Sequence, residues 1–176
     1  MMNNVPLKEK SIVLIGFMGV GKTTIGQAIA KKLQREFIDI DEKIEKEYHM
    51  PTSDIFKRYG EKTFRKKEKD MIEHFSMQKF KVISVGGGAF LQKEIRDICL
   101  AECIVVFLDL TWDSWKERIA LLIDSRPVLQ GKSIDEIKEL YYSRQPIYKE
   151  NHLKIQTDDL DTEEAADAII DSLKTT

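Results

Sequence analysis

The residues with the plainest chemistry lie near the start of the chain, from Gly16 to Thr23 (GFMGVGKT). This stretch matches the phosphate-binding pattern G-x-x-x-x-G-K-[ST] at every position. Its glycines allow successive backbone N–H groups to turn toward one anion at the start of a helix. Lys22 adds a positive charge for the terminal phosphates, and the Thr23 hydroxyl is a ligand for Mg²⁺. The sequence therefore predicts a nucleoside triphosphate site.

Two carboxylates follow the next apolar segment, Asp39 and Asp41 in the stretch FIDID. If the whole stretch is extended, alternation places both side chains on one side of a strand, near the phosphate loop. One carboxylate can then hold the water shell of the metal, while the other accepts a hydrogen bond from an attacking hydroxyl. The alternative is that one of the pair only caps the following helix.

Later motifs carry groups that suit a small anionic acceptor. The stretch Gly60 to Arg65 (GEKTFR) places an arginine beside an aromatic ring, and SRPVL and RQPIY contain Arg126 and Arg144. A guanidinium matches a carboxylate with two parallel hydrogen bonds. Three successive glycines from Gly86 would let a ligand approach the backbone closely. The rest of the charged stretch Lys62 to Lys69 is interpreted as a solvated helix face.

The elements that must position these groups alternate between strand and helix. Short apolar runs predict strands over residues 11–15, 37–40, 81–85, 103–108 and 153–156. Apolar residues at helical spacing predict helices over about 25–33, 64–75, 134–141 and 166–173, and a further helix follows from about Trp112. A turn is expected at Ile55-Phe56, and capping boxes are expected at Ser133 with Glu136 and at Asp161 with Glu164. This order predicts an α/β fold with a mostly parallel sheet, in one domain over residues 1–176. Ligands bind such sheets beyond the carboxyl ends of the strands.

Composition narrows the classes of function. The net charge is −2 and the sequence pI is near 6.0, which argues against a nucleic-acid partner. No apolar run approaches the roughly 18 residues of a membrane span, and the polar start predicts no secretory signal. The two cysteines, Cys99 and Cys103, are interpreted as small buried hydrophobic residues. We expect a cytoplasmic monomer whose partners are small molecules.

The phosphate loop alone also occurs in GTPases and in ATP-driven motors. The chain contains neither D-x-x-G nor N-K-x-D, the switch and guanine motifs of a GTPase. A motor would need an acidic end to the third strand, where this chain has three glycines. These features favour a kinase that closes over a small acceptor.

Five spaced motifs resemble the shikimate kinase family from Ser11 to about Leu173: GFMGVGKTT, DID, GEKTFR, GGG, and SRPVL with RQPIY. The first motif defines only a superfamily, whereas the other four in this order are specific. The resemblance implies a three-layer nucleoside monophosphate kinase fold with a five-stranded parallel sheet and a mobile lid over about 123–133. It also implies ATP-dependent, Mg²⁺-requiring phosphorylation of the 3-hydroxyl of shikimate, a step of aromatic amino acid biosynthesis.

The resemblance implies a role for each matching residue. The groups that would bind ATP are Gly19, Val20, Gly21, Lys22, Thr23 and Thr24, with Arg126 from the lid on the phosphates and Arg118 against adenine. Thr23 and Asp39 would hold Mg²⁺, the second through water. The acceptor would be bound by Asp41, Arg65, Gly87 and Arg144, with Phe56 and Phe64 as an apolar wall. The catalytic residues would be Lys22, Asp41 as general base, and Arg126.

The sequence leaves two alternatives open. The first is another small P-loop kinase, such as a gluconate or nucleotide kinase. A neutral acceptor would leave two arginines without a partner, and a nucleotide kinase would usually carry Gly-Thr after the loop lysine, where this chain has Thr23-Thr24. The second is a nucleotide-binding protein that has lost turnover, although such proteins usually lack the loop lysine or the base, and both are present here.

Overall fold

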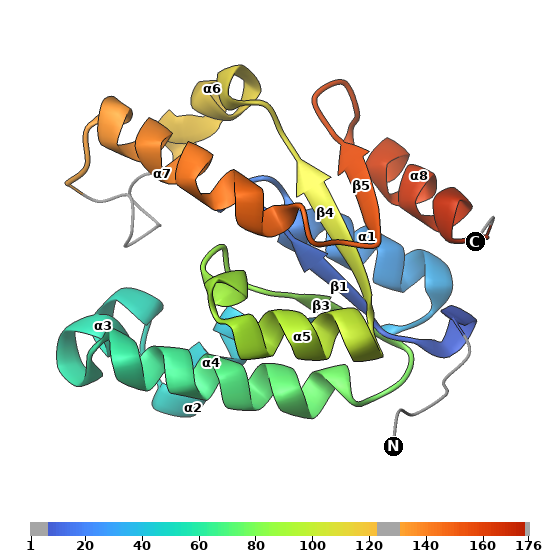
Figure 1. Cartoon of the computed structure of the whole chain (residues 1–176), viewed down its shortest axis with the longest axis horizontal. Coiled ribbons are helices and arrows are strands. Elements are labelled where there is room, and N and C mark those ends of the chain that lie inside the picture. Colours follow the sequence, from blue (N-terminus) through green and yellow to red (C-terminus); the bar gives the residue numbers. More distant parts are fainter. Residues whose placement is uncertain (1–6, 123–130, 175–176) are drawn as a thin grey trace.

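The computed structural model describes residues 7–122 and 131–174. Its centre is a sheet of five parallel strands in the order β2-β3-β1-β4-β5 (Figure 1). The strands are β1 (Ile12–Ile15), β2 (Glu36–Asp39), β3 (Lys81–Ser84), β4 (Ile104–Asp109) and β5 (Leu153–Gln156). The predicted α/β fold with a five-stranded parallel sheet is confirmed.

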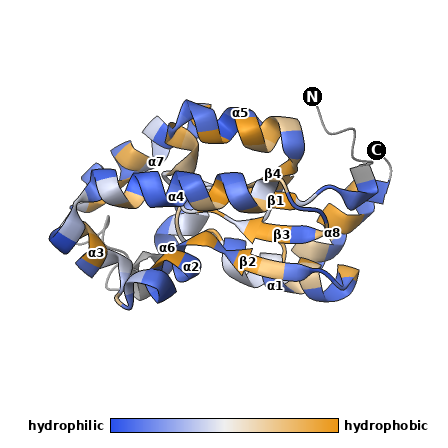
Figure 2. Ribbon diagram, turned by 90° about the horizontal axis from the view of Figure 1, so that it is seen from below, coloured by the Kyte–Doolittle hydropathy of each residue, from blue (hydrophilic) through white to orange (hydrophobic). Residues whose placement is uncertain are grey.

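The central strands form the sheet because they are apolar on both faces. All four residues of β1 are buried, and the register places Val13 between Ile83 of β3 and Val105 of β4. Their β-branched side chains pack well on a pleated surface. β5 lies at the edge and alternates half-buried with exposed residues, which is why its pattern in the sequence is weaker. Figure 2 shows the mostly apolar central strands between helices that alternate hydrophilic and hydrophobic residues.

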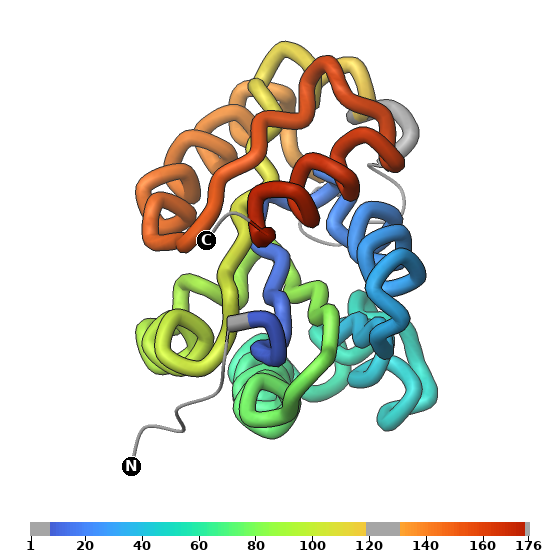
Figure 3. The backbone as a smooth tube through the Cα atoms, turned by 90° about the vertical axis from the view of Figure 1, so that its right-hand side faces the viewer, coloured from blue at the N-terminus to red at the C-terminus, as the bar shows by residue number. Residues whose placement is uncertain are grey.

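Helices cover both faces of the sheet (Figure 3). α1 (Lys22–Leu33) and α8 (Thr162–Lys174) pack together on one face, while α4 (Glu61–Ser76) and α5 (Lys93–Glu102) cover the other. The remaining helices are α2 (Ile40–Tyr48), α3 (Thr52–Tyr59), α6 (Trp112–Leu122) and α7 (Ile134–Tyr148), with short 3-10 turns at Leu7–Glu9 and Ala89–Leu91. Within the described ranges, none of these helices is long and apolar enough to cross a membrane.

Both predicted capping boxes are present. Ser133 Oγ accepts a hydrogen bond from the Glu136 amide at 3.2 Å, and Glu136 Oε1 accepts one from the Ser133 amide at 3.3 Å. Asp161 and Glu164 make the same reciprocal pair at the start of α8, at 2.8 and 3.2 Å. Each pair satisfies two amide groups that have no partner within the helix, and so fixes where the helix begins.

The boundary between β2 and α2 differs from the prediction. β2 ends at Asp39 and Ile40 is already helical, so Asp41 lies in the first turn of α2 and not on the strand. Asp39 is the N-cap of α2, because its Oδ1 accepts a hydrogen bond from the Glu42 amide at 3.1 Å. This local hydrogen bond starts the helix two residues earlier than the alternation of apolar and polar residues indicates.

Two helices are absent from the sequence prediction, α3 and α5. The turn expected at Ile55-Phe56 is wrong, because both residues lie in α3 and the Ile55 side chain is buried in the core. Gly60, with a φ of 87°, ends this short helix and allows α4 to begin at once. In α5 the buried pair Ile95 and Cys99 is too short a stripe to stand out in a charged segment.

The two thiols lie where α5 meets β4, and both are buried. Cys103 Sγ donates a hydrogen bond to the Ser76 carbonyl oxygen at 3.3 Å. Burial raises the pKa of Cys103 to about 12 and also raises that of Cys99. The interpretation of both cysteines as small buried residues is confirmed.

Candidate active site

The phosphate loop connects β1 to α1 and depends on glycine at two positions. A Cβ on Gly16 would lie 2.7 Å from the Leu108 carbonyl oxygen, so only glycine lets the loop leave the sheet here. Gly21 is the N-cap of α1 and has a φ of 103°, a backbone conformation that other residues rarely adopt. The loop therefore presents its amide groups at the start of α1, where the helix dipole also favours an anion.

Lys22 begins α1 and folds back over the loop. Its Nζ donates hydrogen bonds to the carbonyl oxygens of Gly16 at 2.5 Å and Phe17 at 3.4 Å, and the side chain is only 8% exposed. This ammonium group is therefore already placed among the backbone groups that would surround a phosphate. The neighbouring Thr24 hydroxyl donates to the Gly21 carbonyl oxygen at 3.2 Å, and the Val20 side chain is buried beneath the loop.

Thr23 and Asp39 face each other across the space between α1 and β2. Thr23 Oγ1 donates a hydrogen bond to Asp39 Oδ2 at 3.0 Å, while Oδ1 of the same carboxylate caps α2. Asp39 therefore caps α2, as one alternative proposed, and it is also a hydrogen-bonded neighbour of the loop threonine. A hydroxyl and a carboxylate are the hard oxygen ligands that Mg²⁺ prefers, so the pair fits a magnesium ion bound with phosphates.

Asp41 reaches the same region from the first turn of α2. A Cβ at position 86 would lie 3.2 Å from Asp41 Oδ1 and 3.3 Å from Oδ2, so the carboxylate lies against bare backbone at Gly86. Although the predicted strand position was wrong, the predicted proximity to the phosphate loop is correct, because both line one pocket.

That pocket has a volume of about 530 Å³ and lies beyond the carboxyl ends of β1, β2 and β3. Its lining includes twelve of the residues that the sequence singled out: Gly19, Gly21, Lys22, Thr23, Thr24, Asp39, Asp41, Phe56, Phe64, Arg65, Gly87 and Arg144. The aromatic pair Phe56 and Phe64 meets edge to face, with ring centroids 4.8 Å apart, and supplies an apolar wall.

Arg65 enters the pocket from α4 with a buried acid beside it. Its Nη1 is 3.0 Å from Glu68 Oε1, and its Nε is 3.6 Å from Oε1 of the exposed Glu61. A Cβ on Gly88 would lie 2.6 Å from Arg65 Nη2, so the glycine leaves room for the guanidinium. Burial, and secondarily the nearby charge of Asp41, raises the pKa of Glu68 to about 7, while Arg65 opposes this shift.

Glu68 is the site residue that the sequence interpretation missed. The stretch Lys62 to Lys69 was assigned to a solvated helix face apart from Arg65, yet Glu68 is 0% exposed. A signal was present, because Phe64, Glu68 and Ile72 fall at positions i, i+4 and i+8 of one buried stripe. A carboxylate in the middle of an apolar stripe is rarely buried without a paired partner, and here the partner is Arg65.

Arg144 comes from α7 and meets the glycine strand end. It is 7% exposed, and its Nη1 has no hydrogen-bond partner among the described residues. A Cβ on Gly87 would lie 3.6 Å from this Nη1. One turn later, Tyr148 donates a hydrogen bond to the Gly87 carbonyl oxygen at 2.6 Å, and burial raises its pKa to about 12, so it stays a donor. Arg144 is therefore held beside Gly87 with donors available to a ligand.

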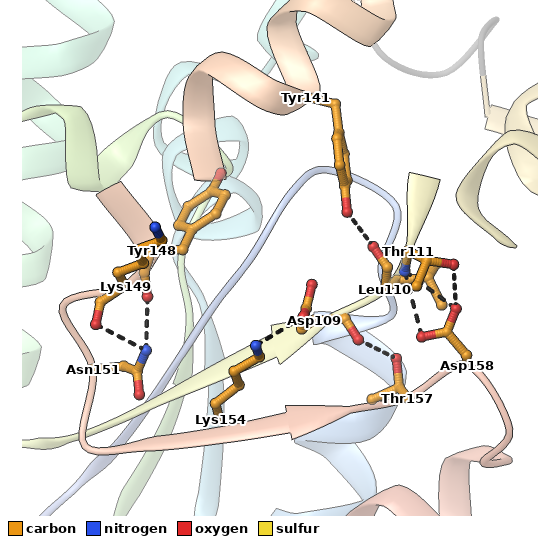
Figure 4. A network of polar contacts seen from close by, with 10 residues as sticks. All are labelled: Asp109, Leu110, Thr111, Tyr141, Tyr148, Lys149, Asn151, Lys154, Thr157 and Asp158. Atoms are coloured by element: carbon orange, nitrogen blue, oxygen red, sulfur yellow. Dashed lines mark hydrogen bonds and ion pairs between the residues drawn. The ribbon is translucent and has the colours of Figure 1, made fainter. Parts of the chain in front are cut away.

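Side chains of α6 and α7 hold these helices against the phosphate loop and the end of β4. Trp115 Nε1 donates to the Met18 carbonyl oxygen at 2.7 Å, and its ring meets Phe17 with centroids 5.1 Å apart. Tyr141 donates to the Leu110 carbonyl oxygen at 2.6 Å, and Asp158 accepts hydrogen bonds from Thr111, as Figure 4 shows. These contacts fix the direction from which Arg144 enters the pocket.

Of the predicted ATP contacts that the structure describes, Val20 and Arg118 do not line the pocket. Arg118 is exposed on α6, one turn beyond Trp115, and is not among the residues that line the pocket. Arg126 and most of the predicted lid lie outside the described residues.

Comparison with known proteins identifies the family. The family model described as shikimate kinase matches residues 18–174. The chain belongs to the shikimate kinase family. It is 62% identical to a shikimate kinase of Oceanobacillus iheyensis, covering 98% of this chain and 94% of that protein. It is 53% identical to one of Bacillus subtilis, over 97% and 92% of the two chains.

A solved structure supports the same assignment. The shikimate kinase of Acinetobacter baumannii, solved in complex with shikimate, superposes with a TM-score of 0.88 at 30% identity, covering 96% of this chain and 95% of that one. The resemblance drawn from the five motifs is therefore confirmed, and the chain is an ATP-using kinase, a transferase with the P-loop kinase fold. The alternative of a gluconate or nucleotide kinase is not supported.

Proposed function

We propose that this chain transfers the γ-phosphoryl group of ATP to the 3-hydroxyl of shikimate, giving shikimate 3-phosphate and ADP. The observation that carries the proposal is one pocket that combines a phosphate loop, the carboxylate of Asp41 and two arginines from different helices. Shikimate has one carboxylate and three hydroxyls. Its binding site therefore needs cationic groups for the carboxylate and a carboxylate group for the hydroxyls. A neutral polyol would leave both arginines without a partner.

On the ATP side, the phosphates bind the amides of Gly19 to Thr24, and Lys22 stabilises the charge that develops on the transferred group. Thr23 would hold Mg²⁺, with Asp39 reaching the ion through water. Once bound, the ion would neutralise charge on the phosphate oxygens. Arg126 would reach the phosphates from the lid over about 123–133, and Arg118 would lie against adenine.

On the acceptor side, Asp41 binds the shikimate hydroxyls and takes the proton of the 3-hydroxyl as it attacks phosphorus. Arg65 and Arg144 bind the carboxylate, and the backbone at Gly87 lets the ring approach closely. The raised pKa of Tyr148 keeps its hydroxyl donating to Gly87, which holds this backbone in place. The enzyme works as a monomer in the cytoplasm. Sedimentation of the purified protein tests the monomeric state.

The acceptor is tested by measuring ADP formation with MgATP and a panel of shikimate, quinate, gluconate and a nucleoside monophosphate. Shikimate should be the preferred acceptor by kcat/KM. Turnover of gluconate or a nucleotide, with none of shikimate, would overturn the proposal. Replacing Mg²⁺ by EDTA should abolish turnover and leave shikimate binding measurable.

The residue roles are tested with Lys22→Ala and Asp41→Asn. The first should lower kcat by at least about 10²-fold, because it removes charge stabilisation of the transferring group, while shikimate binding survives. The second should lower kcat by about 10²–10⁴-fold, because it removes the general base, and should also weaken shikimate binding. Near wild-type turnover of Asp41→Asn would remove this residue from the role of base.

A further inference from the structure

The acceptor pocket contains one buried acid to which the roles above assign no chemistry. Glu68 lines the pocket and is 0% exposed. Its Oε1 accepts hydrogen bonds from Arg65 Nη1 at 3.0 Å and from Gln92 Nε2 at 3.3 Å. Its Oε2 has no hydrogen-bond partner in the described part of the chain. One oxygen of this carboxyl group is therefore buried and able to carry a proton.

The charged groups around Glu68 lie on three elements, α4, α2 and α7. Arg65 and the more distant Glu61 share its own helix, and Asp41 approaches from α2. The same point, where a Cβ on Gly86 would stand, is 3.3 Å from Glu68 Oε2 and 3.2 Å from Asp41 Oδ1. At the N-cap of α5 the neighbour is the neutral Gln92, and from α7 the guanidinium of Arg144 lies beyond Gly87. One cation thus pairs with Glu68 directly, while a second acid faces its other oxygen.

We propose that Glu68 takes up one proton from solution when the acceptor carboxylate binds to Arg65 and Arg144. This inference rests on the proposed function, since it requires an anionic acceptor at this place. The proton comes from water or buffer and becomes bound to Oε2, so no bond of the substrate changes.

The physical reason is competition for Arg65. In the free enzyme, Arg65 pairs with Glu68, and this pairing favours the ionised acid. An arriving carboxylate takes donors of the same guanidinium, brings a second negative charge and excludes water from the pocket. All three changes favour the neutral form of Glu68. Because burial already raises its pKa to about 7, only a modest further rise is needed for net uptake near neutral pH.

Proton uptake determines the direction in which the affinity for shikimate changes with pH. If binding takes up a proton, the Kd for shikimate increases as pH rises above about 7, by up to tenfold per pH unit. The carboxylate of shikimate cannot cause this effect, because carboxylic acids of its kind are fully ionised in that range. Glu68→Gln, which cannot ionise, should give a flat Kd over the same range.

The decisive experiment is calorimetric titration of shikimate into the protein at pH 7.5, in two buffers with different enthalpies of ionisation. The difference between the apparent binding enthalpies gives the number of protons taken up. For wild type we expect between about 0.3 and 0.8 proton, and for Glu68→Gln none. Glu61→Gln is the matched control, because Glu61 also lies near Arg65 but is exposed, and its proton uptake should equal that of wild type.

The results distinguish a failure of the proposed function from a failure of the inference about Glu68. If shikimate produces no binding heat, the proposed function fails. If it binds with no proton uptake in wild type, or if uptake persists in folded Glu68→Gln, the acceptor assignment stands and the inference about Glu68 is wrong. Circular dichroism establishes whether Glu68→Gln is folded. Should it not fold, the wild-type proton number and the slope of Kd from pH 6 to 9 still decide.

Discussion

The two arginines of the acceptor pocket differ in their exposure and in their partners. Arg65 is partly exposed and has a carboxylate partner, whereas Arg144 is 7% exposed and keeps one nitrogen without a partner in the described structure. Both face the glycine strand end, Arg65 at Gly88 and Arg144 at Gly87. Their geometry suits a carboxylate held between two helices.

We expect Arg65→Lys and Arg144→Lys to raise the KM for shikimate and to leave that for ATP nearly unchanged. Lysine keeps the charge but loses the planar fork. A lost charge-assisted hydrogen bond costs about 1.5–3 kcal/mol, which corresponds to about ten- to a hundredfold. Steady-state kinetics with each substrate varied in turn measures both constants.

Arg58→Lys, an exposed arginine of α3 outside the pocket, is the control and should change neither constant. A shikimate analogue without the carboxylate should bind wild type poorly and should be nearly indifferent to Arg65→Ala. If Arg65→Lys and Arg144→Lys change only the affinity for ATP, the acceptor site has been assigned to the wrong place.

Among the elements, α6 has the closest tie to the phosphate loop. Trp115→Phe keeps a ring in the core but leaves the buried carbonyl of Met18 without its donor. We expect a loss of about 1–3 kcal/mol in the free energy of unfolding, and a larger rise in the KM for ATP than in that for shikimate. Urea denaturation and steady-state kinetics measure the two effects.

The neighbouring Trp112→Phe makes the same change of size at another buried position and serves as the comparison. It should lower stability by lost packing and leave the KM for ATP nearly constant. Equal effects of the two variants on ATP would mean that the hydrogen bond to Met18 does not position the loop.

The elements that sequence could predict are those whose pattern is local. β1 and β4 are continuous buried apolar runs, and α7 and α8 carry complete capping boxes. The end of β2 could not be placed, because the side chain of Asp39 both caps α2 and lies beside Thr23, and strand alternation carries no sign of either contact.

The predicted site residues share a similar division. Motif residues such as Lys22 and Arg144 line the pocket because their spacing follows strand ends and helix faces. Glu68 was hidden by the lysines around it, since its burial depends on α4 packing against α5 and on contact with Gln92, which is 24 positions away. Such a contact is made only in the folded chain.

At the scale of the whole molecule, Glu68 makes the free energy of unfolding depend on pH. Its pKa is raised to about 7 in the folded protein by burial, compared with an ordinary value near 4.5. The native state then holds this proton more tightly than the unfolded chain, so its contribution to the free energy of unfolding falls as pH rises from about 4.5 to 7. The whole change is about 3 kcal/mol.

Glu68→Gln removes this dependence, so the variant should gain stability relative to wild type as pH increases across the window. Urea denaturation at pH 5, 6, 7 and 8 gives the two curves. If the curves run parallel, Glu68 does not change its protonation between the folded and unfolded states over this range.

The reactivity of the buried thiols at the junction of α5 and β4 can show when the core of this molecule opens. A cysteine reacts with alkylating reagents as the thiolate and only when the reagent can reach it. Cys99 and Cys103 meet neither condition in the folded chain, because both are buried with raised pKa values. Their labelling, followed by mass spectrometry, should therefore be limited by unfolding of the α5–β4 region. MgATP and shikimate should slow this labelling in proportion to their binding. The labelling rate would then measure how often the native state opens, without any engineered probe.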